Sequence, residues 1–168
     1  MKSAIRLAFT REMAAARQAY KSKDYDTAFH YLERAHILGQ RYFITHMLTH
    51  WFMLKIAIQC IDGREIRGQI FRSIAVIPGY LTGLVPKGNT GRANVSAFKP
   101  MPVPEDLAEL LEDFKIWKEV LLRVIFWLSI ACLIWAGKAI WRMWVEADEG
   151  SMAAISINDA ESSQPHYD

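Results

Sequence analysis

The segment KEVLLRVIFWLSIACLIWAGKAIWRMW, residues 118–144, constrains the fold of this chain more than any other feature. It has no charged residue between Arg123 and Lys138, and tryptophans lie on both sides of this uncharged run. A helix needs about 20 apolar residues to cross the hydrocarbon core of a membrane. The run reaches that length because Arg123 and Lys138 can extend their charges toward the headgroups, where flanking tryptophans are also enriched. We therefore predict a single transmembrane span over about residues 119–141.

Two soluble arrangements compete with this prediction. A buried core helix is the stronger alternative, because apolar runs this short also occur in soluble proteins. A surface helix is disfavoured, because Trp127, Leu128, Leu133 and Trp135 cover nearly every side and leave no polar face. The early charges in MKSAIRLAFTREMAAAR interrupt the apolar core that a signal peptide needs. Basic residues flank both ends of the span, but the large charged N-terminal part without a signal peptide favours an N-inside orientation.

The pattern of apolar residues, glycines and prolines predicts an all-α protein. Short polar breaks separate four expected helices, and short connections favour antiparallel neighbours in a small bundle. Asp24 or Asp26 is the expected N-cap of the second helix, and Gly39 is its expected C-cap. The helices are expected at about residues 3–21, 26–39, 42–61 and 64–77. The expected regions are a helical bundle over 1–77, an ordered Gly/Pro/Asn-rich loop over 78–104, a helical region with the span over 105–145, and a disordered tail over 146–168.

The first two expected helices resemble one tetratricopeptide-type hairpin. The segment ARQAYKSKDYDTAFHYLERA places Ala28, Leu32 and Ala35 where that motif packs its two helices. A repeat fold needs several such units, and only one is visible. The resemblance therefore supports a helical hairpin, and it leaves a non-enzymatic scaffold or adaptor with an unknown protein partner as an alternative function.

Histidine is concentrated in HYLERAHILGQRYFITHMLTH, which holds four of the five histidines of the chain. His46 and His50 are one helical turn apart, and Phe43 and Met47 share their side of the helix. These two imidazoles should project from an apolar face toward the bundle interior. Buried imidazoles need partners, and a metal ion can satisfy two at once.

The second helix carries His30, Glu33 and His36 on the side opposite its apolar stripe. This side is either a solvated face or the face that meets the third helix. The Glu-x-x-His pattern of Glu33 and His36 occurs twice in di-iron carboxylate sites but only once here. A mononuclear site is simpler, with His36, His46, His50 and Glu33 as ligands and His30 as a further ligand or an exposed residue. Glu12 and Glu65 are additional carboxylates without a fixed position.

Imidazole ligands suit iron, zinc or copper, so the expected cofactor is one of these transition metals. The expected function is a membrane-tethered helical protein that handles a metal or carries out an iron-dependent oxidation. No motif identifies a substrate pocket, so the sequence assigns no catalytic residue.

Several other functions are excluded or disfavoured. A net charge of +2 is too small to indicate nucleic-acid binding. The loop PKGNTGRANVS lacks the residue order of a phosphate-binding loop and is interpreted as a cap on the bundle, with Asn89, Thr90 and Asn94 facing the histidines if it is functional. Cys60 and Cys132 form neither a CxxC pair nor a disulfide framework, and Cys60 lacks a nearby base.

Four segments in this order, HYLERAHILGQ, THMLTH, REIRGQIFR and LVPKGNTGRANVSAFKPMPVPEDL, resemble a bacterial family known as domain of unknown function 3703. The resemblance covers about residues 5–107. It implies a small, mostly helical intracellular module without a known reaction, and the later apolar helix looks like an addition to that module. With the predicted span, it places the protein in the bacterial inner membrane, with the lipid bilayer as partner and the bundle in the cytoplasm. The positions that match the family pattern are His30, Glu33, His36, Gln40, His46 and His50.

Overall fold

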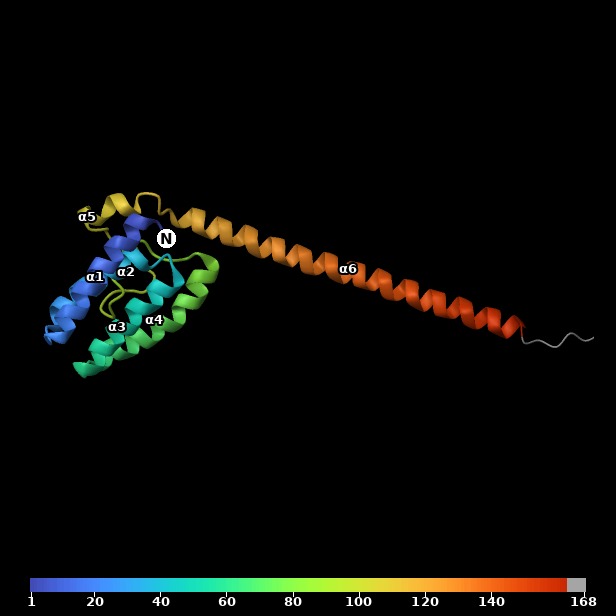
Figure 1. Cartoon of the computed structure of the whole chain (residues 1–168), viewed down its shortest axis with the longest axis horizontal. Coiled ribbons are helices and arrows are strands. Elements are labelled where there is room, and N and C mark those ends of the chain that lie inside the picture. Colours follow the sequence, from blue (N-terminus) through green and yellow to red (C-terminus); the bar gives the residue numbers. More distant parts are fainter. Residues whose placement is uncertain (163–168) are drawn as a thin grey trace, which may run out of the picture. The chain divides into compact units, whose positions relative to one another are not determined.

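The computed structural model describes the backbone of residues 1–162 and the side chains of residues 1–146, and this part of the chain is all-helical. It separates into a compact unit Met1–Val124 and a second unit from Ile125 onward. The helices are α1 (Ser3–Lys21), α2 (Tyr25–Gly39), α3 (Phe43–Gln59), α4 (Gly63–Thr82), the short α5 (Glu105–Ala108) with a 3-10 turn (Glu109–Leu111), and α6 (Ile116–Ser162) (Figure 1). The prediction of an all-α bundle with a long apolar C-terminal helix is confirmed.

Side-chain caps fix where α2 and α4 begin. Asp24 caps α2 by accepting a hydrogen bond from the backbone N–H of Thr27 at 3.1 Å. Asp62 caps α4 in the same way, accepting from the N–H groups of Arg64 and Glu65 at 3.0 Å each. Of the two expected caps for the second helix, the structure selects Asp24.

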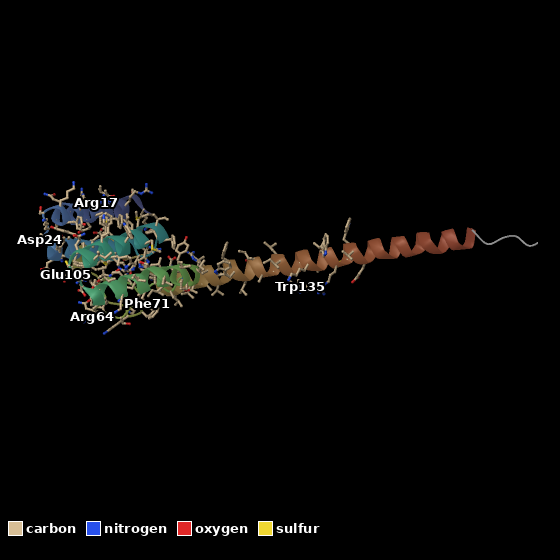
Figure 2. The ribbon with its side chains drawn as sticks, turned by 90° about the horizontal axis from the view of Figure 1, so that it is seen from below. Arg17, Asp24, Arg64, Phe71, Glu105 and Trp135 are labelled. Carbon is tan, nitrogen blue, oxygen red and sulfur yellow. The ribbon has the colours of Figure 1, made fainter. Side chains whose placement is uncertain are left out.

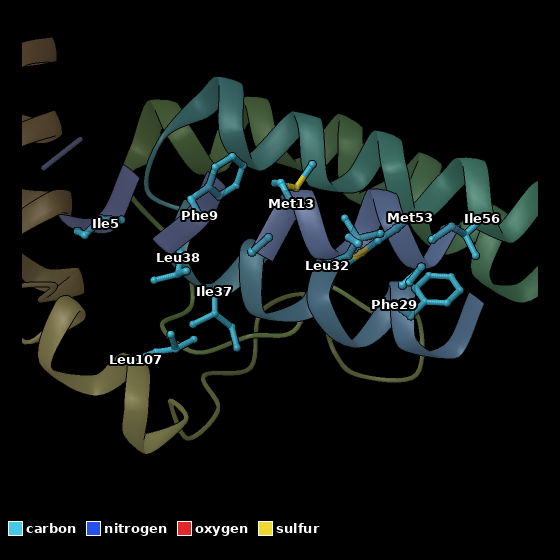
Figure 3. Packing of buried hydrophobic residues seen from close by; sticks show 14 of the residues in the cluster. Ile5, Phe9, Met13, Phe29, Leu32, Ile37, Leu38, Met53, Ile56 and Leu107 are labelled. Carbon is cyan, nitrogen blue, oxygen red and sulfur yellow. The ribbon is translucent and has the colours of Figure 1, made fainter. Parts of the chain in front are cut away.

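The four helices pack in chain order, with α1 against α2, α2 against α3, and α3 against α4 (Figure 1). The core lies between α1, α2 and α3 (Figure 3), where Leu32 and Leu38 of α2 and Met53 of α3 are fully buried. Leu107 of α5 belongs to the same cluster. Because α2 is the middle helix, it buries residues on both of its sides, and this decides where its polar residues point.

Helix α4 continues beyond Pro78 to Thr82, whereas the sequence predicted a helix end at residue 77. Proline removes one backbone hydrogen bond, but here that loss falls in the last two turns of the helix. The Thr82 hydroxyl donates to the Pro78 carbonyl at 2.8 Å. The helix then ends at Gly83, whose φ of 78° is the left-handed conformation that favours glycine. The connecting segment therefore begins at residue 83 rather than 78.

The segment from Gly83 to Pro104 contains no helix and is held by its own hydrogen bonds. The Asn89 side-chain amide donates to the carbonyls of Ser96 and Lys99, both at 2.8 Å. Gly88 has a φ of 77°, and a Cβ there would lie 2.0 Å from the Met101 carbonyl oxygen. The segment is therefore closely packed against itself, and only glycine fits at this crossing.

Within the described residues, α6 contains one stretch that is long and apolar enough to cross a membrane, and none of that stretch is buried. Trp135 and Leu133 are 73% and 72% exposed, and Figure 2 shows Trp135 projecting from the helix. The competing prediction, a core helix covered by protein, is not supported by this exposure. The backbone of α6 stays helical to Ser162, where the sequence predicted a disordered tail from residue 146. The remainder of that predicted tail, 163–168, lies outside the described residues.

Candidate metal centre

Three histidines from two helices meet inside the first unit. His36 comes from α2, and His46 and His50 come from α3. Their ring centroids are 4.6 Å apart for His36–His46 and 4.8 Å for each of the other two pairs. One ligand nitrogen from each ring lies within 4.8 Å of the others, and no other such group occurs among the described residues. The faces of the two helices that carry histidine therefore meet.

The fold explains why His36 points inward although it lies opposite the apolar stripe of its helix. Helix α2 packs between α1 and α3, so its second side faces α3 rather than solvent. His36 is 3% exposed, His50 is 2% exposed and His46 is partly buried. His46 and His50 face the same way because they are separated by four residues of one helix.

The loop after α4 determines which ring nitrogen of His36 carries the hydrogen. Its Nδ1 lies 2.8 Å from the backbone carbonyl oxygen of Asn89. A carbonyl only accepts hydrogen bonds, so Nδ1 carries the hydrogen and donates it. Nε2 is left with a lone pair, and this buried atom has no hydrogen-bond partner among the described residues.

Gln69 of α4 determines which ring nitrogen of His50 carries the hydrogen. The Gln69 amide nitrogen donates to Glu65 Oε1 at 2.7 Å and to the Gly91 carbonyl at 2.9 Å. Its oxygen Oε1 therefore faces His50 Nδ1, 2.7 Å away, and must accept a hydrogen from it. His50 Nε2 also keeps a lone pair, and it lies 3.1 Å from His46 Nε2. Such partners, which orient imidazoles through the nitrogen that does not bind metal, are typical of metal sites.

Burial keeps all three imidazoles neutral. Desolvation is the main cause that lowers the pKa of His46 to about 3 and that of His50 to about 4, and it lowers the pKa of His36 well below 6.5. The positive charge of Arg72 lowers the pKa of all three further. Since imidazole binds metal only in its neutral form, the cluster is ready to bind at neutral pH without releasing a proton.

One pair of nitrogens has the spacing of ligands in a transition-metal site. Metal–nitrogen bonds of about 2.0–2.1 Å in tetrahedral geometry place neighbouring nitrogens about 3.4 Å apart, close to the 3.1 Å between His46 and His50. A hydrogen on His46 Nε2 would also satisfy that contact without metal. The Nε2 of His36 would still lack a partner, however, because both of its neighbours would then be engaged with each other.

Glu33 and His30, which the sequence predicted as further ligands, lie outside this group. Glu33 Oε1 is 3.3 Å from Arg92 Nη1, so its carboxylate is paired with a residue of the loop. His30 is exposed and contacts the Tyr31 ring edge-on. The helical periodicity placed both on the face of His36. In the structure, Glu33 pairs with the loop and His30 is exposed, so neither meets the histidines of α3.

Other polar residues near the site support it without being ligands. Glu65 accepts from Gln69 and from the Ala93 backbone, and Glu12 pairs with Arg34 at 2.9 Å. Asn89 does reach the histidines, through its backbone carbonyl rather than its side chain. Gln69 was missed, because a single glutamine on a separate helix carries no signal in the sequence.

A cavity of about 450 Å³ opens beside the three histidines. Its polar lining, besides the histidines, is Gln40, Arg72, Asn89 and Thr82, and the Thr82 hydroxyl is already bonded to the Pro78 carbonyl. Its remaining walls come from α4 and from the segment after it: Phe71, Ile74, Ala75, Val76, Pro78, Gly79, Leu84, Val85, Pro86, Ala97 and Phe98. The cavity is therefore an apolar pocket with the histidine cluster at its polar end.

A family model described as "Protein of unknown function (DUF3703)" matches residues 3–111. The match agrees with the resemblance seen over about residues 5–107 and covers every histidine of the cluster. No curated protein and no solved structure matches the chain.

Proposed function

Because this chain belongs to the DUF3703 family, whose description names no activity, we propose a function from the site itself. The protein is a membrane-anchored helical protein that binds one transition-metal ion through Nε2 of His36, His46 and His50. The observation that carries this proposal is the unpartnered, buried Nε2 of His36 beside two imidazoles of α3. A buried nitrogen without a partner is costly, and a metal ion removes that cost.

The donor set narrows the chemistry. Three neutral imidazoles suit zinc, copper or iron. Three protein ligands leave one coordination position open, which is typical of sites that act on a bound molecule rather than of closed structural sites. The open position lies on the side of the apolar pocket, because the three histidines form its polar end. Metal handling and an iron-dependent oxidation both remain compatible with such a centre.

Metal binding is tested on the full chain purified in mild detergent. Elemental analysis after zinc, copper or iron loading should give one ion per chain in the wild type and none in His46→Ala/His50→Ala. His30→Ala is the matched control and should keep the ion, because His30 is exposed and outside the cluster. Chelator should lower the melting temperature of the metal-loaded wild type. No stoichiometric ion, together with a melting temperature insensitive to chelator, would refute the proposal and favour the scaffold alternative.

The membrane anchor is a separate part of the proposal. Its support is the exposed apolar stretch of α6 and its flanking tryptophans, and the orientation places the bundle in the cytoplasm of the inner membrane. A reporter fused after Asp168 should be translocated, and the full chain should stay with membranes through a carbonate wash. Release by carbonate would refute the span, and a cytoplasmic reporter would refute the orientation.

A further inference from the structure

The formal charges in the hydrogen-bond and ion-pair network beside the histidine cluster balance one another before any metal ion is present. Arg72 and Arg92 are cationic, and Glu65 and Glu33 are anionic. Arg92 joins the two carboxylates, at 3.3 Å from each. The three histidines contribute no charge when their nitrogens bind metal, and no carboxylate belongs to their group among the described residues. A divalent ion would therefore add an uncompensated double positive charge to a largely buried site.

Uncompensated charge away from water is strongly unfavourable, so an anion is expected at the open coordination position. The protein side chains around the pocket offer this anion few free donors. The Asn89 amide is engaged with Ser96 and Lys99. Arg72 donates from Nη2 to the carbonyls of Arg92 and Val95, which leaves the N–H groups of its Nε and Nη1 as donors. The Gln40 amide lies between the Pro86 carbonyl, at 2.9 Å, and the Gly88 N–H, at 3.0 Å. A phosphate needs more donors than this single guanidinium supplies, whereas a carboxylate can be satisfied by the metal ion together with Arg72.

The rest of the pocket is apolar. Its volume of about 450 Å³ falls within the usual range for small-molecule sites, roughly 300–1,000 Å³. Phe71 of α4 (Figure 2) and Phe98 of the loop line its outer part and are 56% and 71% exposed. Ala75 and Val85 line the walls between these rings and the histidines. A molecule that fills the pocket must have a hydrocarbon body as well as an anionic end.

We propose that this pocket binds an aliphatic carboxylate, with its carboxylate at the open position of the metal ion and its chain along the apolar walls of α4 and the following segment. This inference rests on the proposed metal site and names the class of molecule that the site takes. The single negative charge offsets part of the metal's charge, and the hydrocarbon chain covers the exposed aromatic rings at the outer end.

The test uses the full chain in lipid nanodiscs, loaded with cobalt(II), whose visible absorption reports a change in coordination. Cobalt content is measured in the same sample by elemental analysis. The probes are octanoate, acetate and octanol. Acetate has the same carboxylate as octanoate without the long chain, and octanol has the same chain length without the carboxylate. Each buried methylene strengthens binding about fourfold, so octanoate should bind about 60-fold tighter than acetate even if only half of its six additional methylenes are buried. Octanol should leave the cobalt spectrum unchanged.

Two variants locate the chain within the pocket. Ala75→Trp fills the pocket and should keep cobalt while losing the preference for octanoate over acetate. Ile70→Trp adds the same ring to an exposed position of the same helix outside the pocket and should behave as the wild type. Bound cobalt with equal affinity for octanoate and acetate, or an Ala75→Trp variant with wild-type octanoate binding, would overturn this inference and leave the metal site standing. Absence of cobalt from the wild type would overturn both.

Discussion

Acidification should destabilise the metal-free protein through its buried histidines. In the unfolded chain a histidine has a pKa of about 6.5. In the folded protein, burial lowers the pKa of His46 to about 3 and that of His50 to about 4. The unfolded state therefore binds more protons than the folded state below pH 6.5. The stability is fully present above pH 6.5 and is lost as the pH falls toward the folded pKa values.

The size of the effect follows from linkage. Each of these histidines lowers the free energy of unfolding by about 1.4 kcal/mol per pH unit in this window. From pH 6.5 to pH 5 the loss is about 2 kcal/mol for each, or about 4 kcal/mol for His46 and His50 together. His36, whose pKa is also lowered by burial, acts in the same direction. Domains are typically stable by only roughly 5–15 kcal/mol, so this loss is a measurable fraction of the total stability.

The assay is urea unfolding of the full chain at pH 7 and at pH 5, in non-ionic detergent with chelator present. Pulse proteolysis measures the folded fraction at each urea concentration. The carboxylates of the protein also titrate in this range, so the informative quantity is a difference between variants. The His46→Gln/His50→Gln variant should lose about 4 kcal/mol less than the wild type between the two pH values. His30→Gln should keep the wild-type dependence, because His30 is exposed. A difference below about 1 kcal/mol between wild type and double variant would refute the argument that these imidazoles are buried and neutral.

Three substitutions test other parts of the site and core. Gly91→Ala should weaken zinc binding roughly tenfold or more, because a Cβ at this residue, whose φ is 82°, would lie 2.8 Å from His36 Cδ2; wild-type affinity in a chelator competition would contradict this contact. Gln69→Leu should weaken zinc binding about 10–100-fold, because it removes the oxygen that accepts the Nδ1 hydrogen of His50. An unchanged affinity would show that this hydrogen bond does not help His50 to bind zinc. Leu32→Ala should lower the free energy of unfolding by about 2–5 kcal/mol, since Leu32 is fully buried. Leu7→Ala, at a residue 55% exposed, is its control, and similar losses for both would contradict the described core.

Part of the candidate site was predictable because it depends on one helix only. His46 and His50 lie four residues apart among apolar neighbours, so helical geometry alone places both on an inward face. The same local information placed His30, Glu33 and His36 together on α2. It did not show which of them α3 would meet. The structure brings only His36 to the α3 pair, while Glu33 pairs with Arg92 of the loop.

The hydrogen-bond partners of the histidines were not predictable, because they are far from the histidines in the chain. Gln69 from α4 and the Asn89 carbonyl from the loop place the protons of two histidines. No local pattern distinguishes this glutamine from one in water. The same limit applies to Pro78, which usually ends a helix but here lies within α4 before its last turn.

By itself, the amino-acid sequence determined the elements of this protein: helices from their periodicity, the start of the second helix near Asp24 or Asp26, a long apolar segment, and a histidine pair on one face. These depend on interactions within a few residues of each other. Only the tertiary structure decided which faces meet, which of five proposed ligands form one group, and that an apolar pocket opens beside them. These features depend on packing between distant segments. The helical periodicity of a sequence indicates which residues share a face, but it does not indicate which other segment packs against that face.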